Sequence, residues 1–180
     1  GANVYMISKV GIDGNGEVLV KELVKDNINV DFVFEDEKHP TGTAIITVDK
    51  EANNSIIVAS GANMCIDKCE IIRASDVIKE SDIIISQFET PIEATVEAFK
   101  IAKGNKKITI LNPAPAKDID EELLKYTDII VPNETEAYEL TGIEVKDLGD
   151  VKKAAEKLIE KGVKCAIITL GAKGAAVVTK

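Results

Sequence analysis

The side chains best suited to chemistry follow an apolar run in the second half of the chain. That run, Thr127–Val131, is bounded by turn-forming residues, which is typical of a buried parallel strand. It leads directly into Pro132-Asn133-Glu134-Thr135-Glu136. Because open α/β sheets bind ligands just beyond the carboxyl ends of their strands, one amide and two carboxylates would lie at such a place. These groups could orient a phosphate that carries a metal ion.

A second segment follows about one helix and one strand later. It is a turn with two glycines, which let the backbone come close to a ligand. Its residues are Thr169, Leu170, Gly171, Ala172, Lys173 and Gly174. Taken together with Asn133 and Glu136, this turn indicates a nucleotide site.

Each segment also has a purely structural explanation. Asn133 is a favourable N-cap residue, and Glu136 three positions later completes a pattern like a capping box. The turn at 169–174 could simply connect two strands. The order and position of the two segments along one chain, rather than either segment alone, favours the nucleotide site.

From about residue 67 onward, helical and strand patterns alternate. This alternation predicts right-handed βαβ units and an α/β fold with a mostly parallel sheet flanked by helices. We expect strands at 82–86, 107–111, 127–131, 165–169 and 175–179, and helices at 67–79, 90–103, 120–125, 133–140 and 150–161.

Four of the expected strands end in residues that could bind a ligand. They lead into Gln87-Phe88-Glu89, Asn112, the segment 133–136 and the segment 169–174. Since the carboxyl ends of parallel strands open on the same edge of a sheet, we expect these residues to lie along one edge.

The first third of the chain has a different pattern. It predicts a strand at 4–10, a helix at 17–26, a short strand at 31–34, and a hairpin of strands 43–48 and 55–59 with a polar tip. The consecutive strands suggest a small β-sheet outside the main sheet. We therefore expect three regions: residues 1–30 as the start of the α/β core, 31–60 as the small sheet, and 61–180 as the rest of the core.

The composition disfavours several classes of partner. The chain has 180 residues, of which 45% are hydrophobic, and this suffices for one domain with a real core. Its formal net charge of −9 and its 4% aromatic content disfavour nucleic-acid binding. The sequence has neither a signal-peptide pattern nor an apolar stretch long enough to cross a bilayer. We therefore expect a cytoplasmic protein without a membrane partner.

The cysteines do not indicate a disulfide framework, because the sequence has only three. Cys65 and Cys69 lie four positions apart, which could place two thiols on one helical face. A metal would need further ligands, and His39 is the single histidine. The sequence therefore favours ordinary reduced thiols over a structural zinc site.

Eight short segments, each weak alone, occur in an order that resembles the ribokinase and phosphofructokinase-B-type carbohydrate kinases. The resemblance spans essentially the whole chain, and the stretch Asn112–Ala116 is especially ribokinase-like. The matching segments are Lys9–Gly11 with Asp13 and Gly16-Glu17, Pro40–Ala44, Ser60–Asn63, Gln87–Pro91, Leu111–Ala116, Pro132–Ala137, Leu140–Gly142 and Thr169–Gly174.

The resemblance implies a role for each candidate residue. Glu89 would contact the sugar, Asn133 would face the nucleotide phosphates, and Glu136 would act on the Mg²⁺ shell through water. The segment 169–174 would line the ATP site, with its threonine and first glycine near the phosphates. The small sheet at 31–60 would be a lid that covers the sugar and pairs subunits in a homodimer.

The activity that the resemblance implies is ATP-dependent phosphorylation of a small sugar, D-ribose to ribose 5-phosphate, by in-line transfer with magnesium. Family resemblance also suggests potassium as a cofactor. Fructose, another sugar or a nucleoside remain alternative substrates, and a non-catalytic nucleotide- or sugar-binding α/β module remains an alternative function. A Rossmann dehydrogenase is disfavoured, because no G-x-G-x-x-G follows a strand and opens a helix.

Two departures from the family pattern concern the ends of the chain. The family carries its catalytic aspartate in a late glycine-rich segment and a sugar-binding motif in an early one, and the sequence shows neither. We therefore expect the natural protein to extend at both ends, with the catalytic base beyond Lys180, and this chain alone to be inactive.

Overall fold

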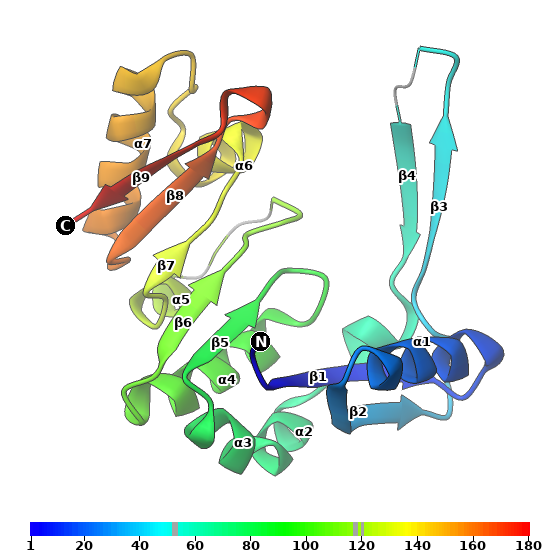
Figure 1. The fold of residues 1–180 in the computed structure, drawn as a ribbon. Coiled ribbons are helices and arrows are strands. Elements are labelled where there is room, and N and C mark those ends of the chain that lie inside the picture. Colours follow the sequence, from blue (N-terminus) through cyan, green and yellow to red (C-terminus); the bar gives the residue numbers. More distant parts are fainter. Residues whose placement is uncertain (52–53, 117–118, 120) are drawn as a thin grey trace. The chain divides into compact units, whose positions relative to one another are not determined.

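The computed structural model describes residues 1–51, 54–116, 119 and 121–180 of the chain (Figure 1). It divides into two compact units, each of which we describe separately. The first comprises Gly1–Ala74 with Glu89–Pro91, and the second comprises Ser75–Phe88 with Ile92–Lys180. Within the described residues, no helix is both long and apolar enough to cross a membrane.

A five-stranded sheet forms the centre of the second unit, and its strands follow one another in chain order from β5 to β9 (Figure 1). The first four strands are parallel, and the last is antiparallel to its neighbour. The expected mostly parallel sheet is therefore confirmed. The strands are β5 (Ile83–Ser86), β6 (Ile108–Leu111), β7 (Ile129–Ile130), β8 (Cys165–Thr169) and β9 (Ala175–Thr179).

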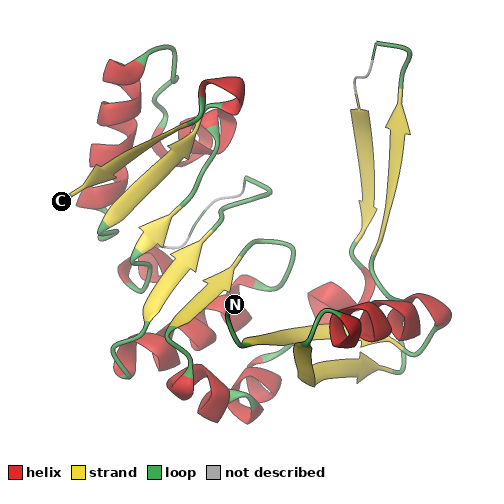
Figure 2. Ribbon diagram, viewed as in Figure 1, coloured by secondary structure: helices red, strands yellow, loops and turns green. Residues whose placement is uncertain are grey.

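The helices of the second unit enclose a core against one face of this sheet (Figure 2). Phe88, Phe99 and Leu158 are fully buried in that core. Side chains alternate along β5, because Ile84 packs against the core whereas Ile85 is exposed on the opposite face. The helices are α3 (Ser75–Glu80), α4 (Ile92–Gly104), α5 (Glu121–Lys125), α6 (Glu134–Thr141) and α7 (Leu148–Glu160).

The parallel strands bring several chain segments to the same edge of the sheet. β5, β6, β7 and β8 all point the same way, so the segments that follow Ser86, Leu111, Ile130 and Thr169 begin at one edge. This confirms the convergence expected from the sequence for the strand ends. Glu89, three residues after β5, groups with the first unit.

At the opposite end of β7, a buried carboxylate joins three neighbouring strands. Asp128 accepts hydrogen bonds from Lys103 Nζ at 2.6 Å and from Lys164 Nζ at 2.8 Å, and its second oxygen accepts from the backbone N–H of Thr109 at 3.0 Å. Burial by itself raises the pKa of Asp128, but the two ammonium groups and the N–H of Thr109 outweigh it and lower the pKa to about 2. The carboxylate is therefore charged at every ordinary pH.

The first unit contains two separate two-stranded sheets. In one, β1 (Val4–Gly11) pairs in parallel with β2 (Ile28–Asp36), and α1 (Gly14–Lys25) connects them. In the other, β3 (Thr43–Val48) and β4 (Asn54–Ala59) form an antiparallel hairpin (Figure 1). The hairpin confirms the small sheet outside the main one. The short helices η1 (Gly61–Cys65) and α2 (Lys68–Arg73) follow.

Asp13 forms hydrogen bonds both with the stem of the hairpin and with the start of α1. Its carboxylate caps the helix by accepting from the N–H of Gly16 at 2.9 Å, and it also accepts from the N–H of Thr41 at 2.8 Å and from the Thr41 hydroxyl at 2.7 Å. The Thr41 hydroxyl in turn accepts from the N–H of Gly11 at 2.9 Å. These hydrogen bonds lower the pKa of Asp13.

Glycines allow the backbone segments around Asp13 to approach each other closely. A Cβ on Gly11 would lie 2.5 Å from the backbone nitrogen of Thr41, and one on Gly61 would overlap the carbonyl oxygen of Pro40. The N–H of Ala62 donates to that same oxygen at 2.8 Å. We call this contact between the end of β1, residues 40–42 and residues 60–62 the glycine junction. Its residues belong to the family-like segments noted in the sequence.

The structure differs from the expected elements at several places. Helix α1 begins at Gly14 instead of residue 17, and β2 covers Ile28–Asp36 instead of 31–34. The helix expected at 67–79 is two helices, α2 and α3, which meet at the fully buried Ala74 and belong to different units. Strand β7 is shorter than expected, because Pro132 has no N–H with which to continue the ladder. Helix α7 begins at Leu148 instead of Asp150, because the Asp147 side chain accepts from the N–H of Asp150 and caps it. The centre of the hairpin tip, residues 52–53, and residue 120 of the expected helix 120–125 lie outside the described residues.

We expect Asp128→Asn to destabilise the protein by about 1–3 kcal/mol, because it removes the charge that pairs with two lysines and leaves buried partners poorly satisfied. The pKa of Asp128 falls on folding from near 3.8 to about 2. Its stabilisation is therefore complete above about pH 4 and is lost as the pH falls from there toward 2. Chemical denaturation at several pH values measures the difference from wild type, which should shrink over that window. Asp76→Asn, which removes an exposed partner of Lys79, should cost less than about 1 kcal/mol; an equal loss in both variants would contradict this role.

We also expect Gly61→Ala to weaken the glycine junction. The new Cβ would collide with the carbonyl of Pro40, and the φ of +50° is one that side chains disfavour, so a loss of about 3 kcal/mol or more is expected. Gly14→Ala is the matched control in the same unit, because no atom lies within 4 Å of its Cβ position. Thermal unfolding followed by circular dichroism compares the two, and similar unfolding temperatures would show that the junction does not constrain the backbone.

Candidate functional site

The two segments singled out in the sequence lie side by side at the carboxyl edge of the second unit's sheet. Asn133, just beyond β7, and Thr169, the last residue of β8, form an isolated parallel bridge. The N–H of Thr169 donates to the carbonyl of Pro132 at 2.9 Å, so the chain segments after the two strands are hydrogen bonded. Asn133 and Thr169 are therefore 36 positions apart in the sequence but direct neighbours in space.

Asn133 and Glu136 form a complete capping box at the start of α6. The Asn133 side chain accepts from the N–H of Glu136 at 2.8 Å, and the N–H of Asn133 donates to Glu136 Oε2 at 2.9 Å. In addition, Asn133 Nδ2 donates to Glu136 Oε1 at 2.9 Å. The capping interpretation of the sequence is thus confirmed. It also fixes Asn133 rigidly at the edge of the sheet, where its orientation is set by Glu136.

Glu136 is suited to a water-mediated contact with a metal rather than to direct coordination. The residue is only 7% exposed, and each carboxylate oxygen already accepts one hydrogen bond from Asn133. A carboxylate oxygen has a second lone pair, which can accept from a metal-bound water molecule. Mg²⁺ usually keeps several waters, so this donor set fits an outer position on its shell.

The turn after β8 has the backbone shape that its glycines allow. Gly171–Lys173 form a short 3₁₀ helix, η2, and Gly171 and Gly174 have positive φ angles of 54° and 96°. The N–H of Leu170 donates to the carbonyl of Gly174 at 2.8 Å, which closes the turn. Among the described residues, no atom outside the adjoining residues lies within 4 Å of the Cβ position of either glycine, so conformation rather than crowding requires glycine here.

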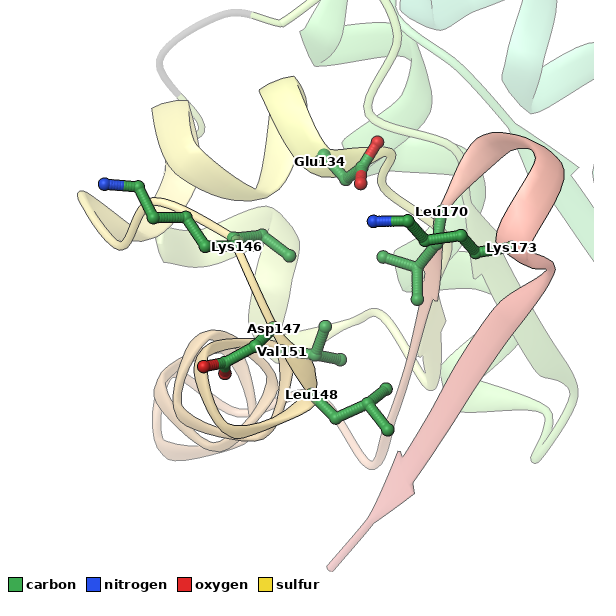
Figure 3. Close-up of a pocket in the computed structure, with 8 residues that line it drawn as sticks. Glu134, Lys146, Asp147, Leu148, Val151, Leu170 and Lys173 are labelled. Carbon is green, nitrogen blue, oxygen red and sulfur yellow. The ribbon is translucent and has the colours of Figure 1, made fainter.

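A pocket of about 380 Å³ opens beside this turn (Figure 3). Aliphatic side chains form much of its wall, and Lys173 and Glu134 extend toward the same side of it. An apolar pocket with a few charged groups at its rim is typical of a small-molecule site. Its lining residues are Glu134, Val145, Lys146, Asp147, Leu148, Val151, Leu170 and Lys173.

The structure therefore brings together most, but not all, of the expected site. Leu170 and Lys173 line the pocket, and Asn133, Glu136 and Thr169 lie at the neighbouring strand ends. Gly171, Ala172 and Gly174 belong to the turn that carries them. Glu89 belongs to the other unit, and its role as a sugar ligand stays a prediction.

The sequence did not predict the residues that line the pocket opposite the turn at 169–174. The loop Val145–Leu148 and Val151, at the start of α7, contribute five of its lining residues. The N-cap pattern of Asp147 was the available signal, because it places the start of α7 and hence the preceding loop. Glu134 lay within the motif but received no separate role.

Comparison with known proteins assigns the family. The model of the pfkB family carbohydrate kinases matches residues 1–180. The chain is 47% identical over 174 residues to the bifunctional ribokinase/ribose-5-phosphate isomerase A of Fructilactobacillus sanfranciscensis, covering 97% of this chain and 32% of that protein. It is 40% identical over 179 residues to the ribokinase of Staphylococcus aureus, covering 99% of this chain and 59% of that protein.

Solved structures agree with this assignment. The structure of Arabidopsis thaliana ribokinase complexed with ribose and ATP has a TM-score of 0.93 and 28% sequence identity, and the match covers 99% of this chain and 58% of that one. The chain thus spans about three fifths of the length of its ribokinase relatives. Its α/β fold, with a mostly parallel sheet and a separate small β-sheet, is ribokinase-like. The chain belongs to the pfkB family of carbohydrate kinases.

Proposed function

We propose that the protein transfers a phosphoryl group from ATP to D-ribose and forms ribose 5-phosphate. The observation that carries this proposal is the identity of 40–47% to proteins named ribokinase over nearly the whole chain. The adjacency of Asn133 and Thr169 at the sheet edge supports it, because these two segments are the ones expected to hold the nucleotide.

In the proposed complex, ATP binds at the carboxyl edge of the sheet in the second unit. The aliphatic pocket beside Leu170 and Val151 suits an adenine ring, whose faces are apolar. The turn at 169–174 then lies next to the phosphates, and the ammonium of Lys173 at the pocket rim would balance part of their charge. Asn133 offers a side chain whose direction is already fixed by the capping box. Such positioning is most of what phosphoryl transfer requires of a protein.

Magnesium would neutralise charge on the transferred phosphate. Glu136 would contribute by accepting a hydrogen bond from a water on the ion, while its two oxygens continue to hold Asn133. We also propose potassium as a cofactor, on the family resemblance alone.

We assign Glu89 to the sugar because a carboxylate accepts hydrogen bonds from hydroxyl groups. We assign residues 31–60 to a lid, whose hairpin β3–β4 has exposed apolar residues on both strands. Exposed apolar surface of this kind suits contact with the same hairpin of a second subunit, and a homodimer through the lid is part of the proposal. We place the protein in the cytoplasm.

The function is tested with the full-length protein in a coupled assay of ADP release. We expect Mg²⁺-dependent turnover with ribose and much slower turnover with fructose or adenosine. Transfer to another of these acceptors with higher kcat/KM would reassign the substrate within the family. Binding of nucleotide without phosphorylation of any acceptor would favour a non-catalytic module instead.

A second prediction concerns Glu136. In the full-length enzyme, Glu136→Gln keeps a residue that capping boxes accept but removes the negative charge, so turnover should fall by roughly 10- to 100-fold. The Mg²⁺ concentration for half-maximal activity should rise. The unfolding temperature should fall modestly, because the Gln NH₂ group cannot accept one of the two hydrogen bonds that Asn133 donates, so activity is measured well below that temperature. Glu139→Gln makes the same charge change on an exposed site of the same helix and should behave as wild type. An unchanged magnesium dependence in Glu136→Gln would argue against the role given to this residue.

A further inference from the structure

Three side chains of different chemistry meet near the stem of the hairpin in the first unit. They are Asp36, His39 and Cys65, and one ligand atom from each lies within 4.8 Å of the other two. His39 Nδ1 lies 3.0 Å from Asp36 Oδ1 and 3.3 Å from Cys65 Sγ. Carboxylate, imidazole and thiolate are all ligands of Zn²⁺ in proteins. Cys69, the other thiol noted in the sequence near this place, is not among the three.

The backbone holds these side chains in place without a metal. Asp36 is the last residue of β2, and its Oδ1 accepts from the N–H of Lys38 and of His39, both at 2.8 Å. These two bonds fix the orientation of the Asp36 carboxylate at the end of β2. Cys65 ends η1, and its Sγ lies 3.8 Å from the carbonyl oxygen of Gly61. Two separate stretches of backbone thus present the ligands to one point.

Two of the three ligand separations are near those of a metal site, and the third, between Asp36 and Cys65, is at most 4.8 Å. With Zn–N near 2.05 Å, Zn–S near 2.3 Å and Zn–O near 2.1 Å, tetrahedral angles separate N from S by about 3.6 Å and N from O by about 3.4 Å. The corresponding separations here, 3.3 Å and 3.0 Å, would each have to widen slightly, and Asp36 Oδ1 would exchange one of its two backbone hydrogen bonds for the ion. His39 is half exposed, so an ion can reach the group from solvent, and water can fill the fourth position.

The charges around the group also permit a cation. Lys9 lies 3.6 Å from Asp36 Oδ2, which is the oxygen that does not face His39, and its ammonium is held by Glu70 at 2.8 Å. One carboxylate and one thiolate would balance a divalent ion. On binding, the Cys65 thiol releases its proton to solvent, and the His39 ring carries its proton on Nε2 and uses the Nδ1 lone pair as the ligand.

We propose that Asp36, His39 and Cys65 form a binding site for Zn²⁺ or a similar borderline transition-metal ion. Asp36 and His39 lie before the hairpin in the chain, and Cys65 lies after it. A bound ion therefore ties the segment that enters the hairpin to the segment that leaves it, next to the glycine junction. The ion would stabilise the stem of the hairpin. This inference does not depend on the proposed kinase activity.

The test is a titration of the reduced, metal-free, full-length protein with Co²⁺, followed by displacement with Zn²⁺. Wild type should bind one Co²⁺ and gain a thiolate-to-cobalt charge-transfer absorption, with visible bands typical of tetrahedral geometry. Cys65→Ser should abolish the charge-transfer absorption. His39→Gln, at an exposed position whose replacement leaves the core untouched, should lower Zn²⁺ affinity by roughly tenfold or more. Cys69→Ser, at an exposed position in α2, should bind like wild type.

Two results would overturn the proposal. One is the absence of a charge-transfer absorption in wild type at Co²⁺ concentrations well above those of the protein. The other is retention of that absorption in Cys65→Ser together with its loss in Cys69→Ser, because a different thiol would then hold the ion. Circular dichroism of every variant in a chelator confirms that each comparison is between folded proteins.

Discussion

The first unit depends on the close approach of backbone to backbone at the glycine junction. Without a side chain at Gly11 and Gly61, the end of β1 can lie against residues 40–42, and Asp13 can bind both the first turn of α1 and Thr41. The positions of α1, of the hairpin stem and of the Asp36–His39–Cys65 group all follow from that contact. This explains in physical terms why glycine, aspartate and threonine recur in the family-like segments of this region.

In the second unit, a polar contact lies at each end of β7, and the two contacts have different roles. At one end Asp128 links β6, β7 and the start of β8 through charged hydrogen bonds. At the other end Asn133 and Glu136 form the capping box that starts α6. The first end therefore serves stability, and in the function that we propose the second end faces the nucleotide. The separation fits the general rule that parallel sheets bind ligands at the carboxyl ends of their strands.

Much of this arrangement could be predicted because it is local in sequence. Apolar runs bounded by glycine gave β8 and β9 with correct limits, and the rule for parallel strands correctly brought Asn133 to Thr169. The loop before α7 could not be placed on the pocket, because loop residues carry no periodicity and their position depends on the packing of α6 and α7. The approach of Asp36 to Cys65 was equally inaccessible, since it results from the glycine junction and the hairpin inserted between them.

The hairpin β3–β4 differs from the core of its unit in how little of it is buried. All twelve strand residues are exposed, so the ribbon adds little to the buried core of its unit. A two-stranded ribbon alone is only marginally stable in water. Its strands can therefore unpair and re-form at a free-energy cost far below that of unfolding the core, and segments of this kind exchange amide hydrogens early. The length and sequence of the ribbon can accordingly diverge between related proteins without disturbing the rest of the fold.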